Sequence, residues 1–316
     1  MNFAIIGSGY IARKGFIPAI KSTEGCNLLG ILNNSAESTF KDAETYECKP
    51  YNDINSLLND NKLDAIYIST PPKFHEYYCI LASRIGLDIL CEKPLSTSLK
   101  NVKNIVDECK KNKTLLMEGF MYQYHPQHNY VKRLINERRL GKPYLFEARF
   151  GFPPFTNTDN FRYKKELGGG ALLDAGVYTI HSARKFFEVE PINVFSVSER
   201  KDGGVDRHGS AILNFGNNQS AHISYGFNNY YQNTYSVWLE RGYLKVNRAY
   251  SMPSELDTEI ILHSNNSEEK ILIDCADQFV LQLKAFINIK GDLKETDRMY
   301  EDAINQATVV DKIYNP

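Results

Sequence analysis

Apolar runs alternate with amphipathic stretches along the first third of the chain. The apolar runs are short and uninterrupted, as in strands that are buried on both faces of a sheet. The stretches between them repeat apolar residues at helical spacing. This alternation predicts a parallel sheet with helices on both faces. The expected strands are Asn2–Gly7, Asn27–Leu32, Asp64–Ser69, Asp88–Cys91 and Thr114–Glu118, and the expected helices are Tyr10–Lys21, Ala36–Glu44, Ile54–Asn59, Phe74–Ile85 and Leu99–Lys111.

The pattern changes after Gly119 and predicts a second domain of another kind. From Ile192 to Ile273, longer strands of alternating polarity are separated by turn residues, which predicts a largely antiparallel sheet. We expect an α/β protein with domains over residues 1–119 and 120–316, and the final helix is able to pack back on the first domain. The expected elements are helices Gln127–Arg139, Gln278–Ile289 and Arg298–Tyr314 (with Asp297 as its N-cap), a helix that begins near Gly168, and strands Pro143–Phe150, Gly209–Phe215, Ser220–Phe227, Tyr235–Leu239, Gly242–Val246 and Thr258–His263.

Length and charge are ordinary for a globular protein. The 316 residues suggest two domains, and the formal net charge of −1 gives no attraction to nucleic acid or to an anionic membrane. No apolar run approaches the ~20 residues of a membrane-spanning helix, and no signal peptide opens the chain. The six cysteines form no CxxC pair, and no histidine cluster has metal-ligand spacing. We expect a cytoplasmic protein with reduced thiols and with no metal, nucleic-acid or membrane partner.

A glycine-rich turn follows the first expected strand and opens a helix. The segment Gly7–Ala12 has the GxGxxA pattern of a dinucleotide-binding turn. The first glycine permits the tight turn, the second lets the backbone approach a pyrophosphate, and the alanine lets the helix pack closely on the strand. The helix N-terminus then offers N–H donors to the phosphates. The expected cofactor contacts of this turn are Gly7, Gly9, Tyr10, Ile11 and Ala12.

The end of the second strand favours NADP(H) over NAD(H). An acidic residue at this place would bind the ribose 2′-hydroxyl of NAD and repel a 2′-phosphate. The chain has the neutral residues Asn33, Asn34 and Ser35 there, and Arg13 lies near the phosphate turn. We expect these residues to contact the cofactor.

Two further strand ends lie at the same edge of the predicted sheet, where ligands bind in such folds. Thr70 and Pro71 follow the third strand, and His75 lies just beyond, where it either contacts ribose or caps the next helix. Glu92 and Lys93 end the fourth expected strand, so the lysine is expected to point toward the cofactor.

A second polar constellation lies on the helix that follows Gly168-Gly169-Gly170. Asp174, Tyr178 and His181 are spaced i, i+4 and i+7, so they share one face of an otherwise apolar helix. Polar groups are costly to bury without a role.

Together these motifs resemble the glucose–fructose oxidoreductase/inositol dehydrogenase/rhizopine-catabolism (Gfo/Idh/MocA) family. The resemblance implies a Rossmann domain followed by an α/β domain with an open, mostly antiparallel sheet that is commonly used for oligomerisation, here in a homodimer or homotetramer. It implies NAD(P)-linked chemistry on sugars, cyclitols or nucleotide-linked sugars. The segments that carry it are Gly7–Ala12, Thr70–His75, Glu92–Pro94, Glu118–Gln127 and Asn160–Tyr178.

The resemblance also implies roles for individual residues. Lys93 matches the family's catalytic lysine, and Asp174 matches its conserved acid. Many members have His where this chain has Tyr178, and Asp where it has His181. The tyrosine is similar to the branch with glucose–fructose oxidoreductase, dihydrodiol dehydrogenases and nucleotide-sugar 3-ketoreductases.

We therefore expect a sugar or nucleotide-sugar ketoreductase. When hydride reaches the carbonyl carbon of the sugar, negative charge develops on the carbonyl oxygen. Either Tyr178 or Lys93 protonates this oxygen, and the choice between the two residues remains open. Asp174 orients Lys93 or a substrate hydroxyl. Tyr122, Arg162 and His181 are the further expected substrate contacts, with Arg162 suited to a diphosphate. Two alternatives remain: a catabolic sugar, cyclitol or dihydrodiol dehydrogenase, and a non-catalytic dinucleotide-binding sensor.

Overall fold

The computed structural model describes residues 1–157, 159–200 and 204–315. Residues 158, 201–203 and 316 lie outside the described residues. The packing divides the chain into two units, Met1–Phe120 with Phe279–Ile304 and Met121–Gln278 with Asn305–Pro316. The domains at 1–119 and 120–316 stay a prediction, since these packing units divide the chain differently after residue 278.

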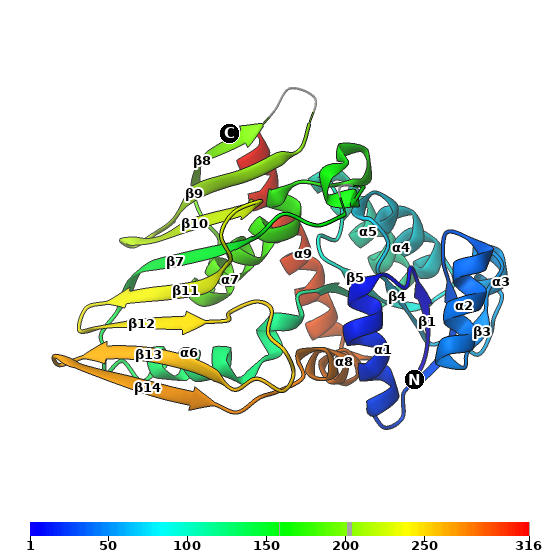
Figure 1. The fold of residues 1–316 in the computed structure, drawn as a ribbon, viewed down its shortest axis with the longest axis horizontal. Helices are drawn as coiled ribbons and strands as arrows, with labels where there is room; N and C mark the ends of the chain where they lie inside the picture. Colours follow the sequence, from blue (N-terminus) through cyan, green and yellow to red (C-terminus); the bar gives the residue numbers. More distant parts are fainter. Residues whose placement is uncertain (158, 201–203, 316) are drawn as a thin grey trace. The chain divides into compact units, whose positions relative to one another are not determined.

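The first unit contains a parallel sheet, as the sequence predicts (Figure 1). Its strands, in sheet order, are β3 (Lys49–Pro50), β2 (Asn27–Leu32), β1 (Asn2–Ile6), β4 (Ala65–Ile68), β5 (Asp88–Glu92) and β6 (Leu116–Gly119). The strand order reverses direction at β1, so the carboxyl ends of β1 and β4 flank the topological switch point where such sheets bind ligands. Its helical segments are η1 (Ala12–Phe16), α1 (Ile17–Ser22), α2 (Ala36–Tyr46), α3 (Ile54–Leu58), η2 (Pro72–Phe74), α4 (His75–Arg84), α5 (Leu99–Asn112), α8 (Gln278–Ile289) and the first part of α9 (Leu293–Tyr314).

Residues far apart in the chain close the core of the first unit. The ring of Phe286 on α8 lies 5.9 Å from the ring of Phe3 on β1, and the Tyr300 hydroxyl of α9 donates a hydrogen bond to the Thr114 carbonyl. Gly15 lets α8 approach η1, because a Cβ there would lie 2.4 Å from the Phe279 ring. These contacts explain why the C-terminal helices complete the first unit.

The second unit contains a mixed sheet in which β10 and β7 are parallel and the remaining neighbours are antiparallel. In Figure 1, α7 lies on one face of this sheet, and its contacts fall on β7 and β10. In sheet order, the strands are β14 (Ser267–Ile273), β13 (Thr258–Ser264), β12 (Gly242–Asn247), β11 (Gln232–Leu239), β7 (Pro143–Phe152), β10 (Gln219–Phe227), β9 (Asp206–Gly216) and β8 (Asn193–Arg200). The helical segments are η3 (Met121–Tyr124), α6 (Pro126–Asn136), η4 (Phe161–Tyr163), η5 (Lys165–Leu167), η6 (Leu172–Gly176) and α7 (Val177–Phe187).

The start of the last helix differs from the expectation. The sequence predicts a helix over Arg298–Tyr314 with Asp297 as its N-cap, but α9 begins at Leu293 and Asp297 lies inside it. Asp292 provides the capping carboxylate, because its Oδ1 accepts hydrogen bonds from the backbone N–H groups of Lys294 and Glu295. The prediction of Asp297 as the N-cap is therefore wrong.

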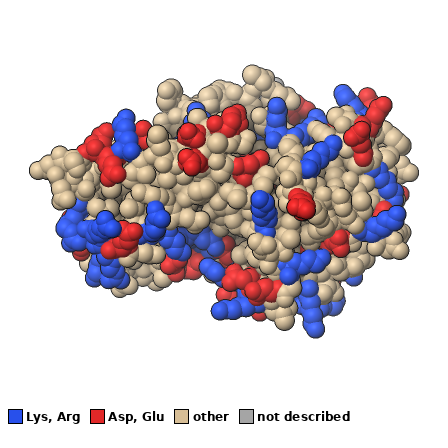
Figure 2. All heavy atoms as spheres, turned by 90° about the horizontal axis from the view of Figure 1, so that it is seen from below, with Lys and Arg blue, Asp and Glu red and all other residues tan. Residues whose placement is uncertain are grey.

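The surface carries charges of both signs. Figure 2 shows acidic and basic side chains mixed over the face that it draws, as expected for a net charge near zero. Among the described residues, no helix combines the length and the apolar character that crossing a membrane requires.

Candidate active site

The glycine turn after β1 leaves space and an unpaired hydroxyl at the edge of the sheet. Gly7 has φ +85°, and a Cβ there would lie 3.0 Å from both the backbone nitrogen and the side chain of Thr70. A Cβ on Gly9 would meet only the Ser69 carbonyl, at 3.9 Å. The Thr70 hydroxyl is buried and has no hydrogen-bond partner among the described residues. Open space beside Gly9 and a buried donor beside Gly7 fit a dinucleotide phosphate.

The remaining residues of the turn divide between packing and exposure. Ala12 is fully buried, Ile11 is half-buried, and Tyr10 is exposed. The small side chain of Ala12 therefore sits where the helix meets the sheet, which is its expected role in this motif. The exposed ring of Tyr10 is available to a ligand at the turn.

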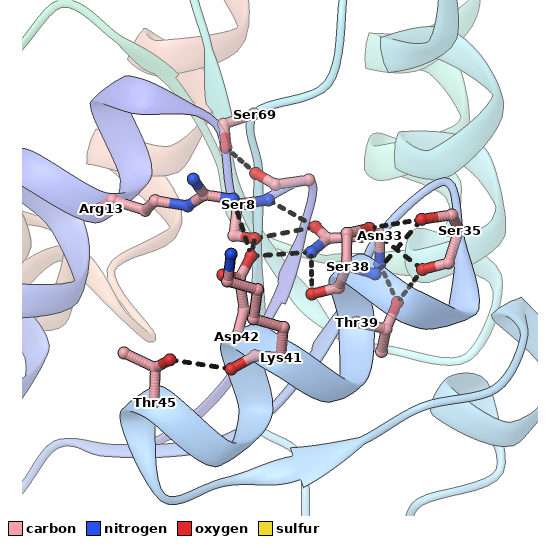
Figure 3. Close-up of polar contacts among 11 residues, drawn as sticks. Ser8, Arg13, Asn33, Ser35, Ser38, Thr39, Lys41, Asp42, Thr45 and Ser69 are labelled. Atoms are coloured by element: carbon pink, nitrogen blue, oxygen red, sulfur yellow. Dashed lines mark hydrogen bonds and ion pairs between the residues drawn. The ribbon is translucent and has the colours of Figure 1, made fainter.

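Asn33 links the glycine turn to α2 by hydrogen bonds of its side chain (Figure 3). Its Oδ1 accepts a hydrogen bond of 2.8 Å from the backbone N–H of Ser8, and its Nδ2 donates to the Ser38 carbonyl at 3.1 Å and to Asp42 at 2.9 Å. Both amide hydrogens of Asn33 are thus engaged inside the unit. Asn34 and Ser35 are exposed at the end of β2, so they are the neutral residues that a cofactor can reach there.

Arg13 forms an ion pair on the side of the turn that faces α2. Its Nη2 lies 2.9 Å from Asp42 Oδ2. Burial by itself raises the pKa of Asp42, but hydrogen bonds from Ser8, Asn33 and Arg13 and the charge of Arg13 outweigh burial and hold the pKa below its usual value. Asp42 was not predicted from the sequence, because it is a carboxylate within α2 rather than at a strand end.

His75 ties two loops together from inside the unit. Its ring is buried, with Nε2 2.8 Å from the Thr70 carbonyl and Nδ1 2.9 Å from the Pro94 carbonyl. Burial lowers the pKa of His75 despite these carbonyl partners. The ring therefore fixes the segment after β4 against the segment after β5 and so positions Thr70 and Pro71.

Glu92 supports the segment that carries the candidate lysine. Its buried carboxylate accepts a hydrogen bond of 2.6 Å from the hydroxyl of Tyr67 on β4. Lys93 follows directly and is half-buried, and the backbone N–H of Leu95 donates to Glu118 at 2.8 Å. The carboxylates of Glu92 and of Glu118 on β6 thus fix the chain on the two sides of Lys93.

In the second unit, the glycine-led helix begins on a buried carboxylate. Gly168 and Gly170 have φ +83° and +126°, which glycine adopts readily. Asp206 on β9 accepts a hydrogen bond of 2.7 Å from the backbone N–H of Leu172, the first residue of η6. Asp206 therefore fixes the start of the helix that carries the candidate polar stripe, and it is a second positioning residue that the sequence reading missed.

The polar stripe divides between two sets of partners. Asp174 accepts a hydrogen bond of 2.6 Å from Arg162 Nε, and the guanidinium of Arg162 lies 5.0 Å from the Phe155 ring and 4.8 Å from the Phe161 ring. His181 is buried, and its Nδ1 lies 2.7 Å from the Tyr122 hydroxyl.

Tyr178 lies between these two pairs in an aromatic cluster. Its hydroxyl donates to the Met121 sulfur at 3.5 Å. Its ring lies 5.2 Å from Phe150 and 5.8 Å from both Tyr122 and Tyr250. A thioether is a weak acceptor, so this contact by itself holds the phenolic proton only weakly.

Three further polar residues lie beside this cluster: His125 and Gln127 are buried, and His128 is half-buried. His128 stacks on Tyr235, and burial lowers its pKa to about 3. His125 Nε2 and Gln127 Oε1 are buried without a hydrogen-bond partner among the described residues. His125 and Gln127 belong to the segment Glu118–Gln127 that carries the family resemblance, and buried polar atoms without a partner are rare in native structures.

The candidate residues thus form one set in each unit. Gly7, Thr70, His75 and Lys93 lie along one edge of the first sheet, whereas Tyr122, Arg162, Asp174, Tyr178 and His181 lie around the glycine-led helix of the second unit. That Lys93 meets Tyr178 stays a prediction.

Family models match most of the chain. The model described as the oxidoreductase family with an NAD-binding Rossmann fold matches residues 1–120, and the model of the GFO/IDH/MocA C-terminal domain matches residues 128–245. The chain belongs to the Gfo/Idh/MocA family of oxidoreductases.

Its relatives include enzymes that act on sugars. The dTDP-3,4-didehydro-2,6-dideoxy-alpha-D-glucose 3-reductase of Saccharopolyspora spinosa is 30% identical over 288 residues, which cover 90% of this chain and 86% of that enzyme. D-xylose 1-dehydrogenase (NADP(+)) 2 of Haloferax volcanii is 27% identical and covers 99% of this chain and 96% of its own length. The 3-ketoreductase KijD10 of Actinomadura kijaniata, solved with NADP and TDP-benzene, superimposes with a TM-score of 0.91 at 27% identity, over 100% of this chain and 97% of its own. The predictions of family and fold class are confirmed.

Proposed function

We propose that the protein reduces the keto group of a nucleotide-linked sugar, with NADPH as the hydride donor. The observation that carries the proposal is Tyr178, a buried phenol four residues after Asp174, whose hydroxyl contacts the Met121 thioether. Full-length similarity to a 3-ketoreductase solved with NADP and TDP-benzene supports the choice of substrate and cofactor.

Each residue has a distinct role in this reaction. Bound NADPH supplies the hydride to the substrate carbonyl carbon. Tyr178 donates its proton to the carbonyl oxygen, and Lys93 stabilises the negative charge on that oxygen and on the tyrosine. Arg162 binds the diphosphate of the substrate, and Asp174 orients Arg162 through the 2.6 Å contact. Tyr122 and His181 support Tyr178 from its buried side through their own hydrogen bond.

The cofactor contacts follow from the first unit. The phosphates lie against Gly7, Gly9 and the Thr70 hydroxyl, in the open space beside the turn. Tyr10, Arg13, Asn34 and Ser35 face the adenosine, which favours NADP(H) over NAD(H) because Arg13 provides a cation and the position after β2 lacks an acid.

Substituted proteins test the roles of the two central residues. Lys93→Ala and Tyr178→Phe are each expected to lower turnover of a TDP-linked 3-keto sugar by about 10²–10⁴-fold, followed by NADPH absorbance, with little change in the Kd of NADPH. Tyr250→Phe is the matched control, since Tyr250 is a buried phenol of the same cluster whose hydroxyl is 2.9 Å from Ser182. Full turnover in Lys93→Ala or in Tyr178→Phe would contradict the proposal.

A sugar dehydrogenase is the second candidate, favoured by the xylose dehydrogenase of Haloferax volcanii that matches along 99% of this chain. Free aldoses and cyclitols with NADP+ separate it from the first candidate, because a ketoreductase for nucleotide-linked sugars needs the nucleotide for binding. NADPH binding without turnover on either panel would indicate a sensor.

We further propose that the protein is a cytoplasmic homodimer or homotetramer. The six cysteines are unpaired, as in a reducing compartment. The face of the second sheet turned away from α7 exposes Phe195, Val197, Ile212 and Trp238, at 45–76% exposure. Phe195 pairs across strands with Ile212, so these side chains lie on one surface. Sedimentation of the wild type and of Phe195→Lys tests this assembly.

A further inference from the structure

A buried carboxylate lies behind the phosphate turn, and the proposed function does not use it. Asp42 is 5% exposed, and its Oδ2 accepts hydrogen bonds from Ser8 Oγ, from Asn33 Nδ2 at 2.9 Å and from Arg13 Nη2 at 2.9 Å (Figure 3). These donors keep the carboxylate ionised at neutral pH, since its pKa is held below the usual value.

The position of this acid is unusual for a dinucleotide-binding sheet. An acid directly after β2 would contact the ribose 2′-hydroxyl and exclude a 2′-phosphate. Here Asn33 occupies that position, and its side-chain amide is hydrogen-bonded to Ser8, Ser38 and Asp42. The acid lies instead on α2, where it forms an ion pair with Arg13.

We propose that Asp42 and the adenosine 2′-phosphate compete for the guanidinium of Arg13, so that Asp42 limits the preference of the protein for NADP(H) over NAD(H). The proposal rests on the proposed function in placing a dinucleotide at the turn. The Arg13 side chain is 49% exposed, so one edge of its guanidinium contacts Asp42 and a ligand can reach the rest. A 2′-hydroxyl leaves Arg13 on Asp42, whereas a 2′-phosphate draws it away or shares it.

The repulsion between Asp42 and a 2′-phosphate is expected to outweigh the benefit that Asp42 gives by positioning Arg13. A 2′-phosphate that approaches Arg13 also approaches the Asp42 carboxylate, and repulsion between anions is screened weakly at a buried group. In the opposite direction, Asp42 orients the Arg13 guanidinium through a single contact of 2.9 Å, and we expect this benefit to be smaller than the repulsion. Removing the charge of Asp42 is therefore expected to favour the phosphate.

Asp42→Asn tests the competition with little change in shape, because the amide oxygen can still accept the bonds from Ser8 and Asn33. Calorimetric titration compares NADP+ with NAD+, and adenosine 2′,5′-bisphosphate with 5′-AMP, so that the nicotinamide and turnover play no part. The Kd of NADP+ and of the bisphosphate is expected to fall about tenfold, or ~1.4 kcal/mol, while that of NAD+ and 5′-AMP changes less than about twofold. Added salt is expected to shrink the difference.

Matched variants identify the cause. Asp60→Asn removes the same charge from the same unit at a distinct ion pair, with Lys49 at 2.7 Å, and is expected to leave each Kd unchanged. Arg13→Gln is expected to bring the Kd of NADP+ to that of NAD+, and this variant decides the matter if Asp42→Asn does not fold. In the Arg13→Gln background, Asp42→Asn is expected to lose most of its effect.

Three results would overturn the competition. Weaker NADP+ binding by Asp42→Asn would show that Asp42 positions Arg13. Equal shifts for NADP+ and NAD+, or none, would show a structural role alone. An unchanged NADP+ preference in Arg13→Gln would remove Arg13 from the 2′ site. A wild type that binds neither dinucleotide would instead refute the proposed function, which keeps the two failures distinct.

Discussion

The start of the glycine-led helix offers a prediction whose size follows from the structure. Asp206 is 4% exposed and accepts a hydrogen bond of 2.7 Å from the Leu172 N–H. Asp206→Ala leaves that N–H buried and unpaired, which costs about 1–3 kcal/mol. Gly170 has φ +126°, and a Cβ there would lie 2.3 Å from Asp206 Oδ1. Gly170→Ala is expected to cost about 1–3 kcal/mol for its backbone conformation alone, and the overlap with the carboxylate adds to it.

The two substitutions are therefore expected to be non-additive. In the Asp206→Ala background the overlapping oxygen is gone, so Gly170→Ala costs only its backbone term. The loss in free energy of unfolding of the double variant is expected to be smaller than the sum of the losses of the two single variants, by about 1 kcal/mol or more.

The chain contains a suitable probe for this cycle. Its single tryptophan, Trp238, lies on β11 of the second unit, so urea titrations followed by its fluorescence report that unit. Because Asp174 and Tyr178 follow Leu172 on the same helix, both single variants are also expected to lower kcat while the Kd of NADPH, a property of the first unit, stays unchanged. Additive free energies, or an unchanged midpoint for Asp206→Ala, would refute the reasoning.

Further predictions concern other buried polar groups. The low pKa of His128, about 3, means that the unfolded chain takes up a proton below pH ~6.5 that the folded chain does not. The free energy of unfolding is expected to fall with pH below ~6.5, by up to about 1.4 kcal/mol per unit for this group, and His128→Gln is expected to flatten the slope between pH 7.5 and 5.5 in urea titrations. Tyr67→Phe removes the 2.6 Å bond to the Glu92 carboxylate and is expected to cost about 1–3 kcal/mol and to lower kcat, measured by thermal unfolding and by turnover. Glu190→Gln weakens two contacts of 2.6 and 2.8 Å to the buried Arg184 and is expected to cost about 1–3 kcal/mol by Trp238 fluorescence; an unchanged midpoint would mean that Gln306, at 2.9 Å, suffices for Arg184.

Local periodicity was sufficient to predict most elements of the fold. The strand Asn27–Leu32 and the helix Gln278–Ile289 have the predicted bounds. The strand Asn193–Arg200 was not singled out, because its outward residues Phe195 and Val197 are apolar and exposed and so break the alternation on which the prediction depends. The last helix began earlier than predicted, because the cap at Asp292 precedes a polar first turn without apolar periodicity.

The candidate site was harder to predict, since contacts between distant segments determine what its polar groups do. Asn33 reads as a free donor at a strand end, yet Ser8 and Asp42, 25 and 9 residues away, engage its side chain. Asp174 and His181 share a helix face in the sequence, but their partners are Arg162 and Tyr122. Helical spacing fixes which residues share a face, and it carries no information about the loop that covers them.

The braces in the first unit have one consequence in common for cofactor binding. Asn33 holds the turn after β1, His75 joins the loops after β4 and β5, and Tyr67 holds Glu92 beside Lys93. Each of these side chains makes its hydrogen bonds to protein groups, so we expect the loops at this edge of the sheet to be ordered before a ligand binds. Binding is then expected to cost little loop entropy, and the Thr70 hydroxyl, buried and without a partner among the described residues, is expected to gain its hydrogen bond from the ligand. Affinity at this edge is therefore expected to depend less on loop closure than on the few groups left available to the cofactor, and this is the condition under which the proposed competition at the Arg13–Asp42 ion pair can change the choice of cofactor.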